Sequence, residues 1–189
     1  MIKTLCLASL LLLGGCAPFK LYTAPAQGLR AQIISQLYTP NSYSNLLSVS
    51  VSTDTGCRLG RQAGQGKEAQ LFSVYNAKSR PEGYQPIAAN TPLHLVMAGT
   101  ASASRVCELE LITTFAAGAR YRLEGGIVDN PAEHAGLCRF NVINADSGES
   151  LVHLETPLQT LPRPDAPFIH ERFSDDGCHV PATDKDRQP

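Results

Sequence analysis

The chain contains 189 residues, and its 16 Lys and Arg residues nearly balance 17 Asp and Glu residues, leaving a formal net charge of −1. Attraction to nucleic acid or to the surface of an anionic lipid membrane needs a stripe of basic side chains, and the sequence has none. A chain of this length can bury the core of one ordinary domain. We therefore expect a single domain without a nucleic-acid partner.

The amino-terminal residues have the pattern of a secretory signal. Lys3 supplies a positive charge, residues 5–13 form an apolar run, and two glycines precede Cys16. The apolar run is about half of the roughly 20 residues that a membrane-spanning helix requires. Residues 13–16, with the sequence Leu-Gly-Gly-Cys, resemble the lipobox of bacterial lipoproteins.

The lipobox resemblance implies a lipid anchor at Cys16. By this resemblance the Cys16 thiol receives diacylglycerol, cleavage follows Gly15, and the new amino terminus is acylated, which anchors a protein stably. An aspartate after the lipidated cysteine commonly retains such proteins in the inner membrane. That position is Ala17 here, which implies the outer membrane, with the protein facing the periplasm. The alternative is an ordinary signal peptide in which Cys16 occurs by chance.

The sequence pattern divides the chain into four segments. Residues 1–15 are the predicted lipoprotein signal peptide, and residues 16–28, with two prolines and little apolar pattern, are the predicted lipidated tether. Residues 29–180 form the predicted folded domain. Residues 181–189 carry no large apolar side chain and are predicted to be disordered.

From Leu29 onward, apolar residues recur more often with a period of two than with the helical period of 3.6. Residues 29–38 and 68–77 are ambiguous between a strand and a short helix. Alternation typical of half-buried strands is clearest in five segments, namely residues 47–51, 93–97, 109–115, 121–123 and 140–142.

Turn residues separate these predicted strands. Asp54-Thr55-Gly56 follows the first clear strand, residues 116–118 predict a hairpin, and residues 146–148 predict a second connection of this kind. Gly125-Gly126 and residues 130–131 predict a longer excursion before Cys138. This spacing predicts an all-β fold: an antiparallel β-sandwich, immunoglobulin-like or transthyretin-like, of about seven or eight strands.

Four cysteines remain once Cys6 leaves with the signal and Cys16 takes the lipid. They are Cys57, Cys107, Cys138 and Cys178. An even number in an exported protein predicts two disulfides, whereas spacings of 50, 31 and 40 residues do not suit a zinc site. Strand parity predicts that Cys107 and Cys138 point inward. Three pairings are open, and nearness in sequence favours Cys57–Cys107 and Cys138–Cys178.

No segment carries a catalytic motif of the serine-hydrolase, metalloprotease or penicillin-binding type. Residues 174–179 share a Gly-Cys pair with the nucleophile motif of L,D-transpeptidases, but Asp176 stands in place of its histidine. We interpret them as a turn before a disulfide cysteine. The five histidines have no metal-ligand spacing; they are His94, His134, His153, His170 and His179. We predict no catalytic residue, metal or cofactor.

The best candidate binding loop is residues 38–43, which begins at Tyr38 and ends at Tyr43. Exposed tyrosines often anchor binding surfaces. The alternative is a plain turn that joins the first two strands.

The sequence therefore favours a non-enzymatic lipoprotein that serves in binding or envelope assembly. Its expected partners are the membrane, through the lipid anchor, and an envelope protein. One alternative is an envelope hydrolase or transferase whose residues meet only in the folded chain, and another is a pilotin-like escort of a secretion apparatus. A cleft with His, carboxylate and hydroxyl groups would favour the enzyme, whereas an apolar groove or a free sheet edge would favour a binding protein.

Overall fold

The computed structural model describes residues 20–40, 45–53, 69–75, 78–101, 105–130 and 135–160. These ranges hold eleven β-strands and no helix, so the predicted all-β class is confirmed for this part of the chain. No helix within them is long and apolar enough to cross a membrane. The predicted signal peptide, Cys16 and the predicted tail at residues 181–189 lie outside these ranges.

Five strands form one sheet in the order β10-β9-β8-β1-β5. Their bounds are Arg30–Tyr38 for β1, Gln85–Ala88 for β5, Arg120–Asn130 for β8, Ala135–Asn144 for β9 and Ser150–Pro157 for β10. The other sheet has six strands in the order β11-β7-β6-β2-β3-β4. Their bounds are Leu46–Ser52 for β2, Ala69–Tyr75 for β3, Lys78–Arg80 for β4, Pro92–Ala101 for β6, Arg105–Thr114 for β7 and Gln159–Thr160 for β11.

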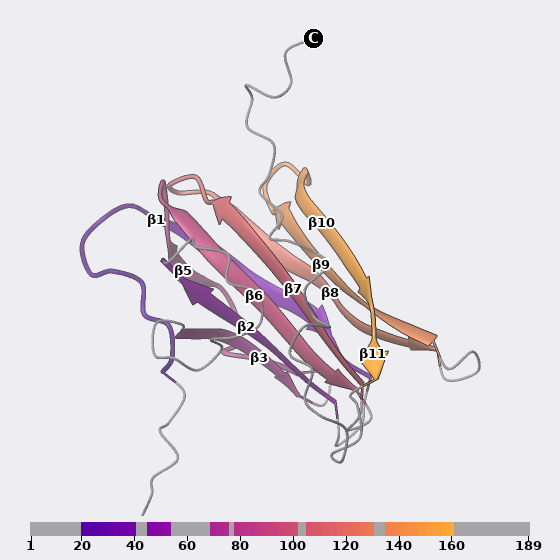
Figure 1. The fold of residues 1–189 in the computed structure, drawn as a ribbon. Coiled ribbons are helices and arrows are strands. Elements are labelled where there is room, and N and C mark those ends of the chain that lie inside the picture. The colour runs from indigo at the N-terminus through magenta and orange to yellow at the C-terminus, as the bar shows by residue number, and fades with distance from the viewer. Residues whose placement is uncertain are drawn as a thin grey trace, which may run out of the picture.

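The two sheets lie over one another, and their long strands run in similar directions (Figure 1). One apolar core fills the space between them, with Phe72 from the six-stranded sheet and Phe140 from the five-stranded sheet both fully buried. Phe115, just after β7, packs edge to face against Tyr121 of β8 with ring centroids 4.8 Å apart. Such aromatic pairs stabilise a core beyond the area that they bury.

The period-two pattern explains which residues enter this core. In β1, Ala31, Ile33 and Leu37 are buried, while Arg30 and Gln36 are exposed. Because successive side chains of a strand point to opposite faces, an alternating sequence buries one face and leaves the other for solvent. Both ambiguous segments, residues 29–38 and 68–77, prove to contain strands, namely β1 and β3.

The pairing of β1 with β8 corrects the prediction of a purely antiparallel sheet. These two strands run parallel, with Gln32 opposite Arg120 and Tyr38 opposite Gly126. They are far apart in the chain, so no tight turn fixes their relative direction. Eight of the eleven strands have seven or more residues, and the three short ones are β4, β5 and β11.

Two turn predictions were wrong in their connectivity, and one was right. Residues 116–118 join β7 to β8, which belong to different sheets. This turn therefore carries the chain from one sheet to the other instead of closing a hairpin. Gly125 and Gly126 lie inside β8, where the sequence predicted an excursion. Residues 146–148 do close an antiparallel hairpin, between β9 and β10.

Part of the predicted tether belongs to the folded body. Gln70 in β3 donates its backbone N–H to the carbonyl of Lys20 at 2.8 Å and accepts one from Tyr22 at 2.9 Å. Ala24 is buried, and the side chain of Tyr22 packs against the core. The folded domain therefore begins by Lys20, ahead of the predicted boundary at Leu29.

A disulfide joins the two sheets, linking Cys107 in β7 to Cys138 in β9 with their Cα atoms 6.3 Å apart. Both cysteines are buried, as their strand parity predicted. This bond corrects the favoured pairs Cys57–Cys107 and Cys138–Cys178. Nearness in sequence misled because it weighs only loop closure, whereas the topology places β7 and β9 against one another across the core.

Removing this disulfide is expected to lower the free energy of unfolding by about 4 kcal/mol, since it closes a loop with a sequence separation of 31 residues. Urea unfolding of the mature protein, followed by circular dichroism, compares the wild type with the double variant Cys107→Ala/Cys138→Ala. Chemical reduction of the wild type should produce a loss at least as large, because it also opens any bond between Cys57 and Cys178. An unchanged midpoint in both experiments would show that the bond does not constrain the unfolded chain.

Candidate functional site

A groove of about 700 Å³ lies beside the N-terminal segment, and we call it the N-terminal groove. It is bordered by three stretches that are distant in sequence: residues 21–30, residues 70–73 of β3, and residues 80–86 around the β4–β5 connection. Its walls are mostly apolar, and Leu21, Leu71 and Pro81 are among the lining residues. Volumes of this size are typical of sites for small ligands.

Hydrogen bonds hold the N-terminal segment in place as one wall of this groove. Arg30 donates from Nε and Nη2 to the carbonyl of Pro25, at 3.1 and 2.6 Å, and from Nη2 to the carbonyl of Ala26 at 2.8 Å. The hydroxyl of Tyr22 accepts the backbone N–H of Ala88 at 3.1 Å. The segment is thus fastened to β1 and β5 as well as to β3.

The strand edges that border the N-terminal groove are already occupied. Pro86 has no N–H to offer at the outer edge of β5, and the N–H of Ala88 is bound by Tyr22. On β3, Gln70 uses both its N–H and its carbonyl in bonds to residues 20–22. An incoming chain therefore finds no free backbone ladder here, so recognition in this groove must use side chains.

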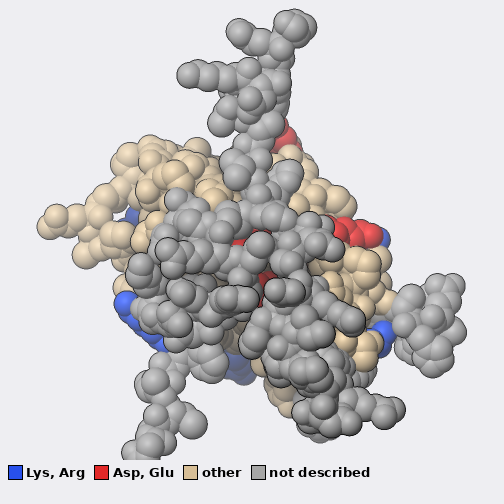
Figure 2. All heavy atoms as spheres, viewed as in Figure 1, with Lys and Arg blue, Asp and Glu red and all other residues tan. Residues whose placement is uncertain are grey.

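The charge of the N-terminal groove is positive. Arg30 and Arg80 line it, and none of the described residues that line it is acidic. In Figure 2, Lys and Arg side chains appear at the left, lower-left and right margins of the visible face, and Asp and Glu side chains appear near its centre, at its top and at its upper right. Within the described ranges, the side chain of Arg80 makes no hydrogen bond or ion pair, so its guanidinium is available to a ligand.

A second, more open groove of about 490 Å³ lies on the other side of the β4–β5 connection, and we call it the β1 groove. Residues 34–38 of β1 line it together with residues 78–83. The hydroxyls of Ser35 and Ser79 hydrogen-bond at 2.9 Å and tie β1 to β4 across the gap between the sheets. Its lining includes one cation, Lys78, and one carboxylate, Glu82.

Tyr38 borders the β1 groove, and its side chain is 52% exposed, in line with its proposed place in a recognition loop. The backbone of Tyr38 lies very close to Gly126 of β8. A Cβ atom at position 126 would overlap the backbone N, C and O atoms of Tyr38. Gly126 also has a φ of 114°, which residues with a side chain rarely adopt. Tyr43, the other tyrosine of the predicted loop, lies outside the described residues.

A buried contact between a histidine and a glutamate lies on the outer side of the six-stranded sheet. Nε2 of His94 in β6 is 3.0 Å from Oε2 of Glu110 in β7, and the two side chains are only 7% and 8% exposed. Ser52 of β2, which is also buried, stands opposite His94 in the strand register. Val96, which neighbours the pair along β6, is buried as well although it points away from the core.

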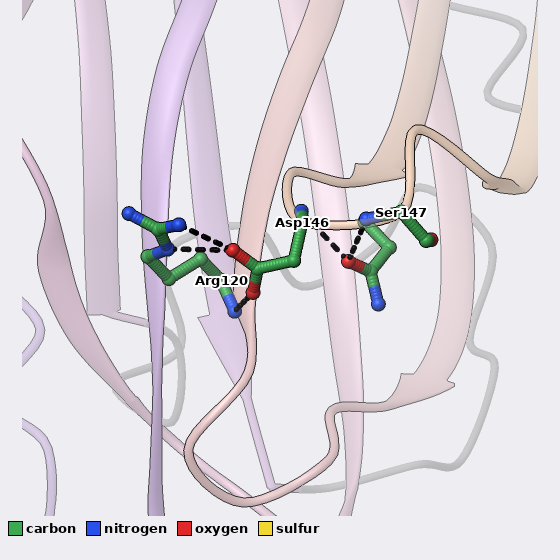
Figure 3. Close-up of polar contacts among 4 residues, drawn as sticks. Arg120, Asp146 and Ser147 are labelled. Carbon is green, nitrogen blue, oxygen red and sulfur yellow. Dashed lines mark hydrogen bonds and ion pairs between the residues drawn. The ribbon is translucent and has the colours of Figure 1, made fainter.

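An exposed ion pair fastens the β9–β10 hairpin to β8 (Figure 3). Arg120 donates from Nε and Nη2 to Oδ1 of Asp146, at 2.8 and 2.5 Å, and Asn144 Oδ1 accepts the N–H groups of Asp146 and Ser147. The hydrogen bond from Arg120 lowers the pKa of Asp146 below its ordinary value of 3.8, and the same contact raises the pKa of Arg120. The stabilising contribution of Asp146 is therefore complete at neutral pH and is lost as the pH falls below about 3.8.

The structure places the predicted site residues unevenly. Cys107 and Cys138 are a core disulfide, Tyr38 borders a groove, and His153 is exposed on β10. The remaining candidates lie outside the described residues; they are Cys16, Tyr43, Cys57, His134, His170, Cys178 and His179. No group of three or more potential metal ligands occurs among the residues that the structure describes.

Sequence reasoning missed the N-terminal groove and the His94–Glu110 pair. The groove is formed by three stretches that are far apart in the sequence, so no local sequence pattern predicts it. The pair had a faint signal, because His94 and Glu110 each occupy an outward position in a predicted strand. Comparisons with protein-family models, with curated proteins and with solved structures found no match for the chain.

Proposed function

We propose that the protein is a lipid-anchored, non-enzymatic binding module that works at the outer membrane and faces the periplasm. The observation that carries this proposal is the placement of the N-terminal groove. Its wall starts at Leu21, so at most about 18 Å of extended chain separate it from the predicted lipid at Cys16. A protein anchored this closely presents the groove at the membrane surface.

The β1 groove supports the same proposal. It is lined by residues of the same β4–β5 segment as the N-terminal groove, so residues 78–86 contribute to both concave surfaces. Tyr38 adds an exposed aromatic residue, and its backbone packs closely against Gly126. Such residues often contribute most of the affinity of a binding surface. We infer that an envelope partner or ligand is recognised here.

The proposal includes a finer description of the fold. We infer a β-sandwich of the immunoglobulin-like or transthyretin-like kind with two disulfides, supported by the shared core and by the Cys107–Cys138 bond between the sheets. With that bond formed, the other two cysteines of the mature chain, Cys57 and Cys178, can only pair with each other within one molecule. An exported protein with four such cysteines is expected to contain this second bond.

Complementation of a bacterial deletion strain tests the binding function. We expect Arg80→Glu and Tyr38→Ala to restore little of the phenotype at wild-type abundance, because they remove the free cation of one groove and the aromatic residue of the other. His153→Ala is the control, since this exposed residue lies on β10, at the far edge of its sheet. Full complementation by both groove variants would refute the proposed binding site.

The same strain tests the anchor. Cys16→Ser is expected to leave the precursor uncleaved or to release the protein from membranes, because lipidation and processing both require that thiol. Fractionation of the envelope and the apparent mass of the protein report the outcome. Normal processing and normal membrane attachment of Cys16→Ser would overturn the lipoprotein proposal.

One observation favours the alternative of a hydrolase or transferase. Ser52, His94 and Glu110 lie on three adjacent strands and on one face of their sheet, which is the set of groups that a serine nucleophile with its base would use. These side chains are buried and line neither groove, so we rank this function second. A Ser52→Ala variant that is fully stable but fails to complement would favour the enzyme.

A further inference from the structure

The N-terminal groove combines apolar walls with positive charge. Its walls expose apolar surface, and among the described residues that line it the charged ones are Arg30 and Arg80. We propose that it binds a single-chain lipid with a compact anionic headgroup, of which a fatty acid is the simplest example. This inference rests on the proposed binding function and names the class of ligand for that site.

The apolar walls suit a hydrocarbon chain. Leu21 is 66% exposed at the groove although it lies in a segment held by backbone hydrogen bonds on both sides. Tyr22, Leu71, Pro81 and Pro86 extend the apolar lining from β3 to β5. A leucine that stays in water forgoes the free energy of burial, and a bound acyl chain would recover part of that.

The two arginines suit the headgroup. The hydrogen bonds of Arg30 use Nε and Nη2, so its Nη1 retains both of its donors, and Arg80 retains all of its own within the described ranges. Guanidinium groups bind carboxylate and phosphate oxygens in a paired geometry that lysine does not match. Both residues line the groove, so a headgroup bound there has guanidinium donors from two side chains in its lining.

An extended peptide fits this groove less well than a lipid. A peptide that binds along a sheet needs a free row of backbone donors and acceptors. Here Pro86 and the Tyr22–Ala88 bond close the edge of β5, and Gln70 of β3 is paired with residues 20–22. The ligand must therefore bind through apolar contact and charge, which a single-chain anionic lipid supplies.

Photolabelling of the mature, lipid-modified protein tests the inference. The protein is embedded in phosphatidylcholine nanodiscs and exposed to a fatty acid that carries a photoactivatable diazirine in its chain. We expect labelled peptides from residues 20–30, 70–73 and 80–86, which form the groove. The methyl ester of the same probe lacks the charge and should label these peptides about tenfold less, the usual consequence of losing a charged hydrogen bond.

Two variants on one short strand separate the groove from general surface charge. Arg80→Glu is expected to reduce labelling about tenfold, because it reverses the charge at the groove. Lys78→Glu changes a cation of the same strand that lines the β1 groove instead, and it should leave labelling unchanged. Thermal unfolding of both variants confirms that they fold.

Several results would overturn the inference. They are equal labelling by the ester, equal loss in both variants, labels that fall outside the groove, and stronger competition by an apolar peptide with a free C-terminal carboxylate than by unlabelled fatty acid. Absent labelling combined with failed complementation by Arg80→Glu would also overturn it, while the proposed binding function would survive.

Discussion

The Gly126→Ala variant is expected to lose about 3 kcal/mol or more of its free energy of unfolding. The new Cβ atom would overlap the backbone of Tyr38 in the neighbouring strand β1. A rigid backbone cannot yield as the end of a side chain does, so β1 and β8 must separate at this point. Overpacking of this kind costs roughly 1–3 kcal/mol, and the positive φ of 114° adds roughly 1–2 kcal/mol for any residue with a Cβ atom.

Gly28→Ala is a matched control for the Gly126 variant. Gly28 has nearly the same φ, 117°, but a Cβ atom there would have no neighbour within 4 Å. Its substitution therefore measures the backbone strain alone. Urea unfolding of both variants gives the difference, and equal losses would show that Tyr38 makes room for the methyl group. A large loss at Gly126 should also disturb the β1 groove, since Tyr38 borders it.

The His94→Leu variant is expected to lose about 3 to 5 kcal/mol. His94 and Glu110 meet at 3.0 Å with side chains that are almost completely buried. Taking away the imidazole leaves the carboxylate of Glu110 in a poorly solvated place without that partner, which is costly for a buried pair. The double variant His94→Leu/Glu110→Leu removes both polar groups and should recover much of the loss.

An exposed pair on the other sheet provides the comparison for His94. Arg139 donates to Glu155 at 2.7 Å, but the two side chains are 45% and 39% exposed. Water already screens this pair, so Arg139→Ala should cost less than about 1 kcal/mol. Urea unfolding of all four proteins at neutral pH checks the series. A double variant as unstable as His94→Leu would show that lost packing, and not the loss of the imidazole beside the Glu110 carboxylate, causes the effect.

Local sequence patterns predicted where the strands lie in the chain but not which strands pair with one another. The alternation in β6 and β7 reflects a half-buried surface, which the sequence records directly. It does not record which strand lies beside β1, because the partner strand β8 begins about eighty residues further along and runs parallel to it. The same reason explains the disulfide. Parity predicted that Cys107 and Cys138 face inward, but only the sheet order shows that they face each other.

Of the candidate site, the sequence predicted one residue, Tyr38, but not the grooves that the folded chain forms. Tyr38 could be selected because an aromatic residue next to a turn is commonly exposed. Arg80 could not, since it is one of many cations in the sequence until the fold places it in the same groove as Arg30. His94 was assigned to a strand with an outward side chain. Its burial depends on contacts that the alternating pattern does not reveal.

The closed edge of β5 has a consequence for how copies of this protein behave together. Molecules that share one membrane surface collide far more often than the same number dispersed in a volume, and an open strand edge is a template for sheet-to-sheet aggregation. Pro86 and the Tyr22 hydroxyl withhold the backbone donors of that edge, close to where an anchor at Cys16 would hold the domain. At this edge, crowding on the membrane would therefore not start a growing sheet.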